Sequence, residues 1–277
     1  MNRGTVTDNR DTYPVIVGVD GSFAAIRAAR WAAVVAEKFA APLQIMHAAA
    51  DPAHRESAKA ILQSAHQAVR VNFKGLHITT ARVEGSAEQA LIESSHAARL
   101  IVLGSDDLSS GTAVFGESIC PVVAWHGHAV SSTRQPVVVG VDHDQDSRVA
   151  IPATFEFADR LGVGVIAVHA WTIQRPIGNV TLPAAILWRQ VETDAQQHLS
   201  KALLRWTDLY PNVEVTQVLA PDKPSGALLR CSQDAQMVVV GSRATGPPVG
   251  AVPGSIGLDL LRHSTIPVMF CHSVDHS

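Results

Sequence analysis

Val17-Gly18-Val19-Asp20 recurs in the second half of the chain as Val139-Gly140-Val141-Asp142. Pro14 and Pro136 precede the two copies at the same distance. A short apolar run that ends in an aspartate is typical of a buried strand, and it is too short for a helix. A buried strand that returns with its flanking residues indicates a tandem duplication of one structural unit.

Further matches extend the repeat along both halves. Three pairs of segments correspond: Met46-His47-Ala48 with Val168-His169-Ala170, Leu103-Gly104-Ser105 with Val240-Gly241-Ser242, and Pro121-Val122-Val123-Ala124 with Pro267-Val268-Met269-Phe270. The length of 277 residues fits two domains at roughly 100–200 residues each. We therefore predict a mobile tail at residues 1–12, a first domain at 13–126, a Ser-, Thr- and His-rich linker at 127–135, and a second domain at 136–273.

Composition excludes several classes of protein. Hydrophobic residues make up 47% of the chain but occur in short runs, so no segment reaches the roughly 18 apolar residues of a membrane span. The net charge is −3 and the basic residues are scattered, which argues against nucleic-acid binding. The N-terminal tail lacks the apolar stretch of a secretory signal, and the three cysteines show no C-x-x-C spacing. The sequence predicts a cytoplasmic protein with buried, reduced thiols.

Strand and helix patterns alternate through each half. We predict strands at Val15–Val19, Leu43–His47, Leu76–Val83 and Leu100–Leu103, and again at Val137–Val141, Val163–Val168, Val213–Leu219 and Met237–Val240, each set followed by the proline-led last strand. Helical spacing covers residues 25–39, 53–73 and 187–203, and Ser86 with Gln89 forms a capping-box pattern. This alternation predicts an α/β protein with two tandem, doubly wound domains, each with a parallel five-stranded sheet.

Open parallel sheets bind ligands at the carboxyl ends of their strands. The residues that end the predicted strands are Asp20, Ala48 and Gly104 in the first half, and Asp142, Ala170 and Gly241 in the second. His47 and His169 also close equivalent strands, and we predict that they orient a loop instead of acting as bases.

A glycine-rich segment at residues 241–255 follows the fourth strand of the second half and leads into a helical pattern. Glycines let the backbone approach a ligand, and the pair Gly254-Ser255 would place free N–H groups and a hydroxyl at a helix start. Phosphate is the ligand that this chemistry favours, although glycines and prolines also build ordinary surface loops.

With these motifs the chain resembles a tandem universal stress protein, whose domains carry Gly-x2-Gly-x9-Gly-Ser/Thr after the fourth strand and an aspartate after the first. Gly241, Ala244, Gly254 and Ser255 match that spacing, with alanine in place of the second glycine. The resemblance runs from about Pro14 to Cys271. It implies an adenine nucleotide α-hydrolase-like fold and, in the second half, bound ATP, either alone or with Mg²⁺.

The nucleotide contacts that the resemblance implies are made by residues of the second half: Gly140, Asp142, Ala170, Val240, Gly241, Ala244, Gly254, Ser255 and Ile256. Asp142 and the backbone around Ala170 would face the adenine and ribose, and the loop would hold the triphosphate. Ala244 and the prolines of the loop disfavour close backbone approach and remove N–H donors. A homodimer is also implied.

The first half departs further from the family pattern. Asp107 stands at the second glycine position, and Gly116-Glu117 stands where the second half has Gly254-Ser255. Gly116 also lies much closer to Pro121 than Gly254 does to Pro267, which predicts that the phosphate-binding helix is deleted. We interpret this half as degenerate, with Asp20, Ala48 and Gly104 as an alternative adenine pocket.

Other chemistries find no support. The chain has no P-loop, no G-x-S-x-G nucleophile elbow and no metal-ligand cluster, so we assign no catalytic and no metal residues. The sequence predicts a nucleotide-binding stress regulator with slow ATP hydrolysis at most. A nucleotide-free assembly or partner-binding module with degraded ATP sites is the alternative, and an adenylating enzyme lacks any further motif.

Overall fold

The computed structural model describes residues 12–49, 55–104, 111–126, 134–142, 146–171, 184–242 and 253–272. The chain forms two compact units: residues 1–131 with 242–254 and 274–277, and residues 132–241 with 255–273. The predicted tail and linker fall almost wholly outside the described residues, as does Ala244. The predicted domain limits therefore stay predictions.

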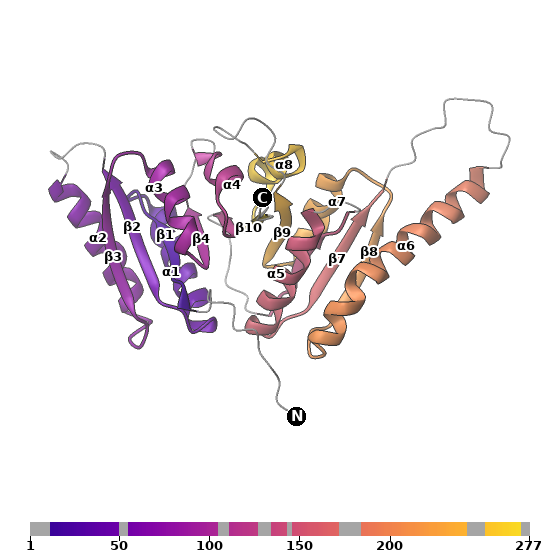
Figure 1. Ribbon diagram of the computed structural model, residues 1–277, viewed down its shortest axis with the longest axis horizontal. Helices are drawn as coiled ribbons and strands as arrows, with labels where there is room; N and C mark the ends of the chain where they lie inside the picture. Colours follow the sequence, from indigo (N-terminus) through magenta and orange to yellow (C-terminus); the bar gives the residue numbers. More distant parts are fainter. Residues whose placement is uncertain are drawn as a thin grey trace. The chain divides into compact units, whose positions relative to one another are not determined.

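The first unit is a parallel sheet covered by helices (Figure 1). Its strands follow the order β3-β2-β1-β4-β5, and the four neighbouring pairs are parallel. In chain order its elements are β1 Val15–Gly18, α1 Phe23–Lys38, β2 Leu43–Ala49, α2 Arg55–Arg70, β3 Ile78–Glu84, α3 Ala87–Ser94, β4 Leu100–Gly104, α4 Val114–Glu117 and β5 Val122–Trp125.

The second unit repeats this plan with the strand order β10-β9-β6-β7-β8. Its elements are β6 Val137–Gly140, α5 Asp146–Leu161, β7 Val165–Ala170, α6 Ala184–Leu209, β8 Val215–Ala220, α7 Pro224–Cys231, β9 Met237–Ser242, α8 Ser255–His263 and β10 Val268–His272. The predicted fold class, two tandem doubly wound units with five strands each, is confirmed.

Glycine and alanine let the helices approach the sheet of the first unit on both faces. Leu103 is in register with Gly18, so both residues face the same side of the sheet, where Leu91 of α3 lies against Gly18. A Cβ built on Gly104, the next residue, would point to the opposite side of the sheet, toward α1. The buried face of α1 is almost entirely alanine, and a Cβ at Gly104 would lie 2.4 Å from the Cβ of Ala28.

Several element boundaries differ from the predicted ones for local reasons. Strands β7 and β8 begin two residues later than the apolar runs at Val163 and Val213, because the Val163 N–H donates to Ala158 and the Val213 N–H to Tyr210. Ser86 does precede α3, but its side chain caps no N–H group, so the predicted capping box is not formed.

The fourth helix of the first unit is shortened and not deleted. Helix α4 keeps one turn, Val114–Glu117, whereas α8 has 9 residues. The early Pro121, which precedes β5, leaves no chain for a longer helix. The prediction of a missing helix was therefore wrong in degree, and the first unit retains a single turn at that position.

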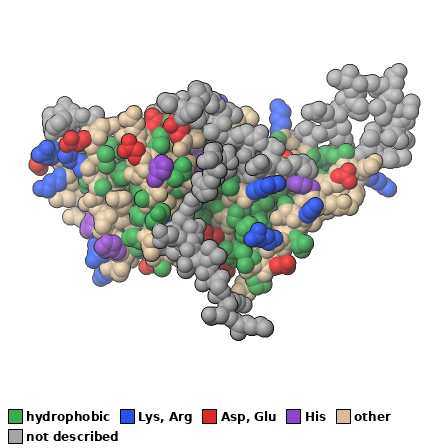
Figure 2. Space-filling model, in the orientation of Figure 1, with side chains coloured by type: hydrophobic (Ala, Val, Ile, Leu, Met, Phe, Trp, Pro, Cys, Tyr) green, Lys and Arg blue, Asp and Glu red, His purple; other side chains and the backbone are tan. Residues whose placement is uncertain are grey.

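No helix in the described part of the chain is long and apolar enough to cross a membrane. On the face that Figure 2 shows, basic and acidic side chains are interspersed on each unit. Cys120 and Cys271 are buried free thiols as predicted, but Cys231, the last residue of α7, is only half-buried.

Gly104→Ala is expected to lower the free energy of unfolding by about 1–3 kcal/mol, because the new Cβ collides with Ala28 and with the Ala24 carbonyl oxygen at 2.9 Å. Gly75→Ala is the matched control, since its Cβ meets nothing within 4 Å and the change should stay within about 0.5 kcal/mol. Urea denaturation measures both, and equal midpoints for the two variants would contradict the close packing of α1 on β4.

Burial raises the pKa of the Cys271 thiol to about 12 and also raises that of Cys231, where the nearby Arg230 opposes the effect. Because the thiolate is the reactive form, a disulfide reagent at pH 8 should react in the native protein with Cys231 alone. All 3 thiols should react after denaturation, and Cys231→Ser should abolish native labelling. Native labelling of Cys271 would show that β10 opens.

Candidate functional site

Five of the predicted site residues of the second half lie at one edge of the sheet. Strands β9, β6 and β7 are neighbours, and Val139 pairs with Val239 while Gly140 pairs with Val168. Because these strands are parallel, their carboxyl ends meet at the same edge. Gly140, Asp142, Ala170, Val240 and Gly241 therefore lie along that edge.

A histidine stabilises the turn after the first strand in both units. The His47 Nδ1–H donates to the Val19 carbonyl at 2.7 Å, and the His169 Nδ1–H donates to the Val141 carbonyl at 2.7 Å. A carbonyl oxygen only accepts, so the hydrogen bond defines the tautomer. The prediction that these histidines orient a loop is confirmed, and each loop is the one that carries a candidate aspartate.

The two aspartates sit in different local settings, and both are exposed. Asp20 accepts a hydrogen bond from the Ser22 N–H at 2.8 Å across Gly21, whose φ of +90° suits glycine. Ser22 in turn caps α1 by accepting from the Ala25 N–H at 3.1 Å. In the second unit the Asp142 N–H donates to the Ser147 hydroxyl at 2.6 Å.

His198 of α6 is a neighbour that the sequence analysis missed. Its Nε2 lies 3.4 Å from the Asp142 carbonyl oxygen, and its ring centroid lies 5.6 Å from that of His169. In the sequence, His198 was marked only by its position one residue before Leu199, which is buried, on a long helix. It adds a polar ring beside the candidate nucleotide edge.

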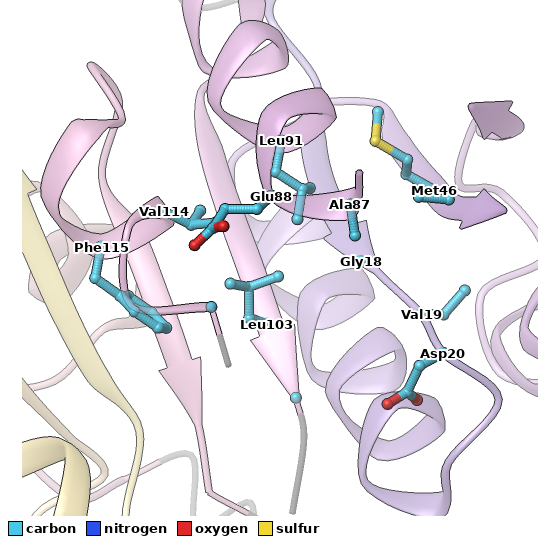
Figure 3. Close-up of a pocket in the computed structure, with 13 residues that line it drawn as sticks. Gly18, Val19, Asp20, Met46, Ala87, Glu88, Leu91, Leu103, Val114 and Phe115 are labelled. Atoms are coloured by element: carbon cyan, nitrogen blue, oxygen red, sulfur yellow. The ribbon is translucent and has the colours of Figure 1, made fainter. Parts of the chain in front are cut away.

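The first unit holds a cavity of about 200 Å³ at its own carboxyl edge (Figure 3). All three residues that the sequence named for this half line it. The complete lining is Gly18, Val19, Asp20, Met46, Ala48, Ala87, Glu88, Leu91, Leu103, Gly104, Gly111, Val114 and Phe115. The wall is mostly apolar, and Asp20 and Glu88 are its charged members.

Glu88 is the second residue that sequence reasoning missed. Its Oε1 accepts a hydrogen bond at 3.2 Å from the N–H of Ala113, the residue that caps the one-turn helix α4. Figure 3 shows its carboxylate directed toward Val114 at the start of that helix. A side chain of the protein thus bonds an amide at the start of α4, the position that corresponds to the predicted phosphate-binding helix start of the second half.

The equivalent position in the second unit is neutral. Leu91 of α3 lies 3.5 Å from a Cβ built on Gly18, and Leu228 of α7 lies 3.4 Å from one built on Gly140, which aligns Glu88 with Ser225. The Ser225 hydroxyl donates to the Asp259 carboxylate of α8 at 2.9 Å. The two units therefore place opposite hydrogen-bonding roles at the same point of the fold.

The predicted phosphate loop of the second half is described only at its end. Pro253 is buried, Gly254 is half-buried and directly precedes α8, and the first residue of that helix, Ser255, is exposed. Ile256 follows within the helix. Residues 243–252, including Ala244, lie outside the described residues, so their predicted contacts stay a prediction.

The glycines that were predicted as site residues have different structural roles. Gly104 is required by the approach of α1, whereas a Cβ on Gly140 would meet Leu228 at an ordinary contact distance of 3.4 Å. Gly104 therefore counts as a packing residue that also borders the cavity.

Comparison with known proteins matches both halves of the chain. The model of the universal stress protein family matches residues 13–128 and 133–272. A universal stress protein from Mycolicibacterium smegmatis is 30% identical over 286 residues, which cover 93% of this chain and 96% of the relative. A second one, from Mycobacterium tuberculosis, is 31% identical over 291 residues, covering 94% and 97%.

Solved structures share the fold. A universal stress protein from Archaeoglobus fulgidus superposes with a TM-score of 0.68 at 18% identity, covering 94% of this chain and 98% of that one. A protein of unknown function from Pseudomonas aeruginosa gives a TM-score of 0.64 at 14% identity. The two family matches and the full-length relatives establish that this chain belongs to the universal stress protein family and carries two copies of its domain.

Proposed function

We propose that this chain is an ATP-binding regulatory protein of the stress response, with the nucleotide held mainly by the second half. The observation that carries the proposal is the contrast between the two fourth helices. Helix α8 is a full helix that begins at Ser255, directly after Gly254, whereas α4 is a single turn preceded by Ala113, whose N–H is bonded by Glu88. Of these two described helices, α8 is the one that could offer a complete helix start to a phosphate.

The chemistry at the start of α8 favours an anion. The first N–H groups of a helix have no partner within it, and the helix dipole adds partial positive charge there. The first turn of α8 has no acidic residue, and Arg262 and His263 occupy its last turn. Phosphates would accept hydrogen bonds from these amides and from the Ser255 hydroxyl.

The strand ends supply the chemistry for a nucleoside. The exposed Asp142 carboxylate follows β6, where it can accept hydrogen bonds from ribose hydroxyls. Ala170, at the end of β7, has too small a side chain to block a flat base. The Ser147 and His169 hydrogen bonds hold the turn that carries Asp142, so the acceptor is positioned before a ligand arrives.

The same geometry argues for slow hydrolysis at most. His169 is 3% exposed, so burial keeps its ring from reaching a terminal phosphate as a general base. Binding without fast turnover suits a regulator whose nucleotide-bound form persists. We also propose, from the family resemblance, that the protein is cytoplasmic and forms a homodimer.

Gly254→Asp is expected to abolish ATP binding, because it adds a carboxylate at the point where the phosphates would lie. Titration calorimetry of the wild type with ATP and Mg²⁺ should show a dissociation constant on the order of micromolar. The matched control is Gly75→Asp, the same substitution at an exposed glycine with open space around it, and it should bind like the wild type.

The alternative function gives a different result. If neither the wild type nor Gly75→Asp binds ATP, the glycine-rich loop has lost nucleotide binding and the chain acts as an assembly or partner-binding module. If Gly254→Asp binds as tightly as the wild type, the nucleotide does not use the start of α8 and the proposed site is wrong.

A further inference from the structure

The cavity of the first unit differs in charge from a phosphate site. Its walls come from the ends of β1, β2 and β4 and from α3 and α4, and most of its exposed surface is apolar. Among the described residues that line it, the charged side chains are Asp20 and Glu88, both acidic, and none of these residues is Lys, Arg or His. An anion that entered would therefore meet two carboxylates on the described part of the wall.

Glu88 also removes the donor that an anion would need. The Ala113 N–H at the start of α4 donates to its carboxylate, so that amide is satisfied from within the protein. A phosphate could reach the amide only by displacing a like charge, and walls of low polarity strengthen the repulsion. Ser225 at the equivalent place in the second unit carries no charge.

The remaining features favour a small, flat, uncharged molecule. Leu91 and Leu103 offer apolar surface, and Figure 3 shows the Asp20 carboxylate away from them, beyond Gly18. Carboxylates accept hydrogen bonds from hydroxyl and amino groups. The volume of about 200 Å³ is below the roughly 300–1,000 Å³ of pockets for drug-sized ligands.

We propose that the first unit binds a phosphate-free ligand with an apolar ring and hydrogen-bond donors, a nucleoside and not a nucleotide, and that Glu88 is the residue that excludes the phosphate. The two units of one chain then select the unphosphorylated and the phosphorylated forms of related ligands. This inference rests on the proposed function only in the choice of adenine as the base of the test ligand. Its own evidence is the cavity of the first unit.

Adenosine and AMP form the test pair, because they share base and sugar and differ in the phosphate. In the full chain with Gly254→Asp, which removes the phosphate contacts proposed for the second unit, the binding component that Ala87→Trp abolishes reports the first unit. Ala87 is exposed at the start of α3, and a large ring there closes the cavity. In calorimetry this component should bind adenosine at least about tenfold more tightly than AMP.

Glu88→Gln tests the source of the selectivity. It keeps the size of the side chain and an acceptor oxygen but removes the charge, so AMP affinity should rise about tenfold while adenosine affinity stays within about threefold. Glu93→Gln is the matched control, since Glu93 is exposed on the same helix and does not line the cavity. It should leave the adenosine-to-AMP ratio unchanged.

Three results would overturn the proposal: no adenosine binding by the Gly254→Asp chain, equal affinity for adenosine and AMP, or an unchanged ratio in Glu88→Gln. If Gly254→Asp fails to fold, the wild type replaces it, and the adenosine binding that Ala87→Trp removes is compared with AMP binding in the same way. A wild type that binds adenosine at the first unit but no ATP refutes the proposed function alone, so the two failures are distinguishable.

Discussion

The close contact between α1 and β4 is the constraint on which the first unit depends. A helix can cover a central strand this tightly only where neither side presents a large side chain, and here glycine at position 104 meets an alanine face. That approach fixes where β4 ends relative to β1, since Leu103 is in register with Gly18. The cavity at the carboxyl edge takes its shape from these two strand ends.

Much of this architecture could be predicted from sequence. Repeated strand-end motifs such as Val-Gly-Val-Asp mark the duplication, and short apolar runs alternate with helical spacing, which is enough for a doubly wound fold. The first residues of β7 and β8 were harder to predict. Val163 and Val213 look like strand residues in the sequence because they are apolar, but their N–H groups bond back to the preceding helix or turn.

The site was only partly accessible to the same reasoning. Strand ends are local features, so Asp20, Ala48 and Gly104 could be named from sequence, and they do line one cavity. Glu88 could not, because its importance arises from a bond to Ala113, 25 residues away, on a helix whose length depends on Pro121. His198 likewise becomes relevant only when α6 packs beside the end of β6.

The shared histidine bond has a consequence for how the candidate loops are anchored. In both units the ring donates from Nδ1 to a main-chain carbonyl 28 residues earlier in the chain. The bond joins the turn after the first strand of each unit to the neighbouring second strand, β2 or β7. The side chain that holds each turn thus lies outside the turn itself, so the residues of the turn can differ between the two units while its anchor stays the same.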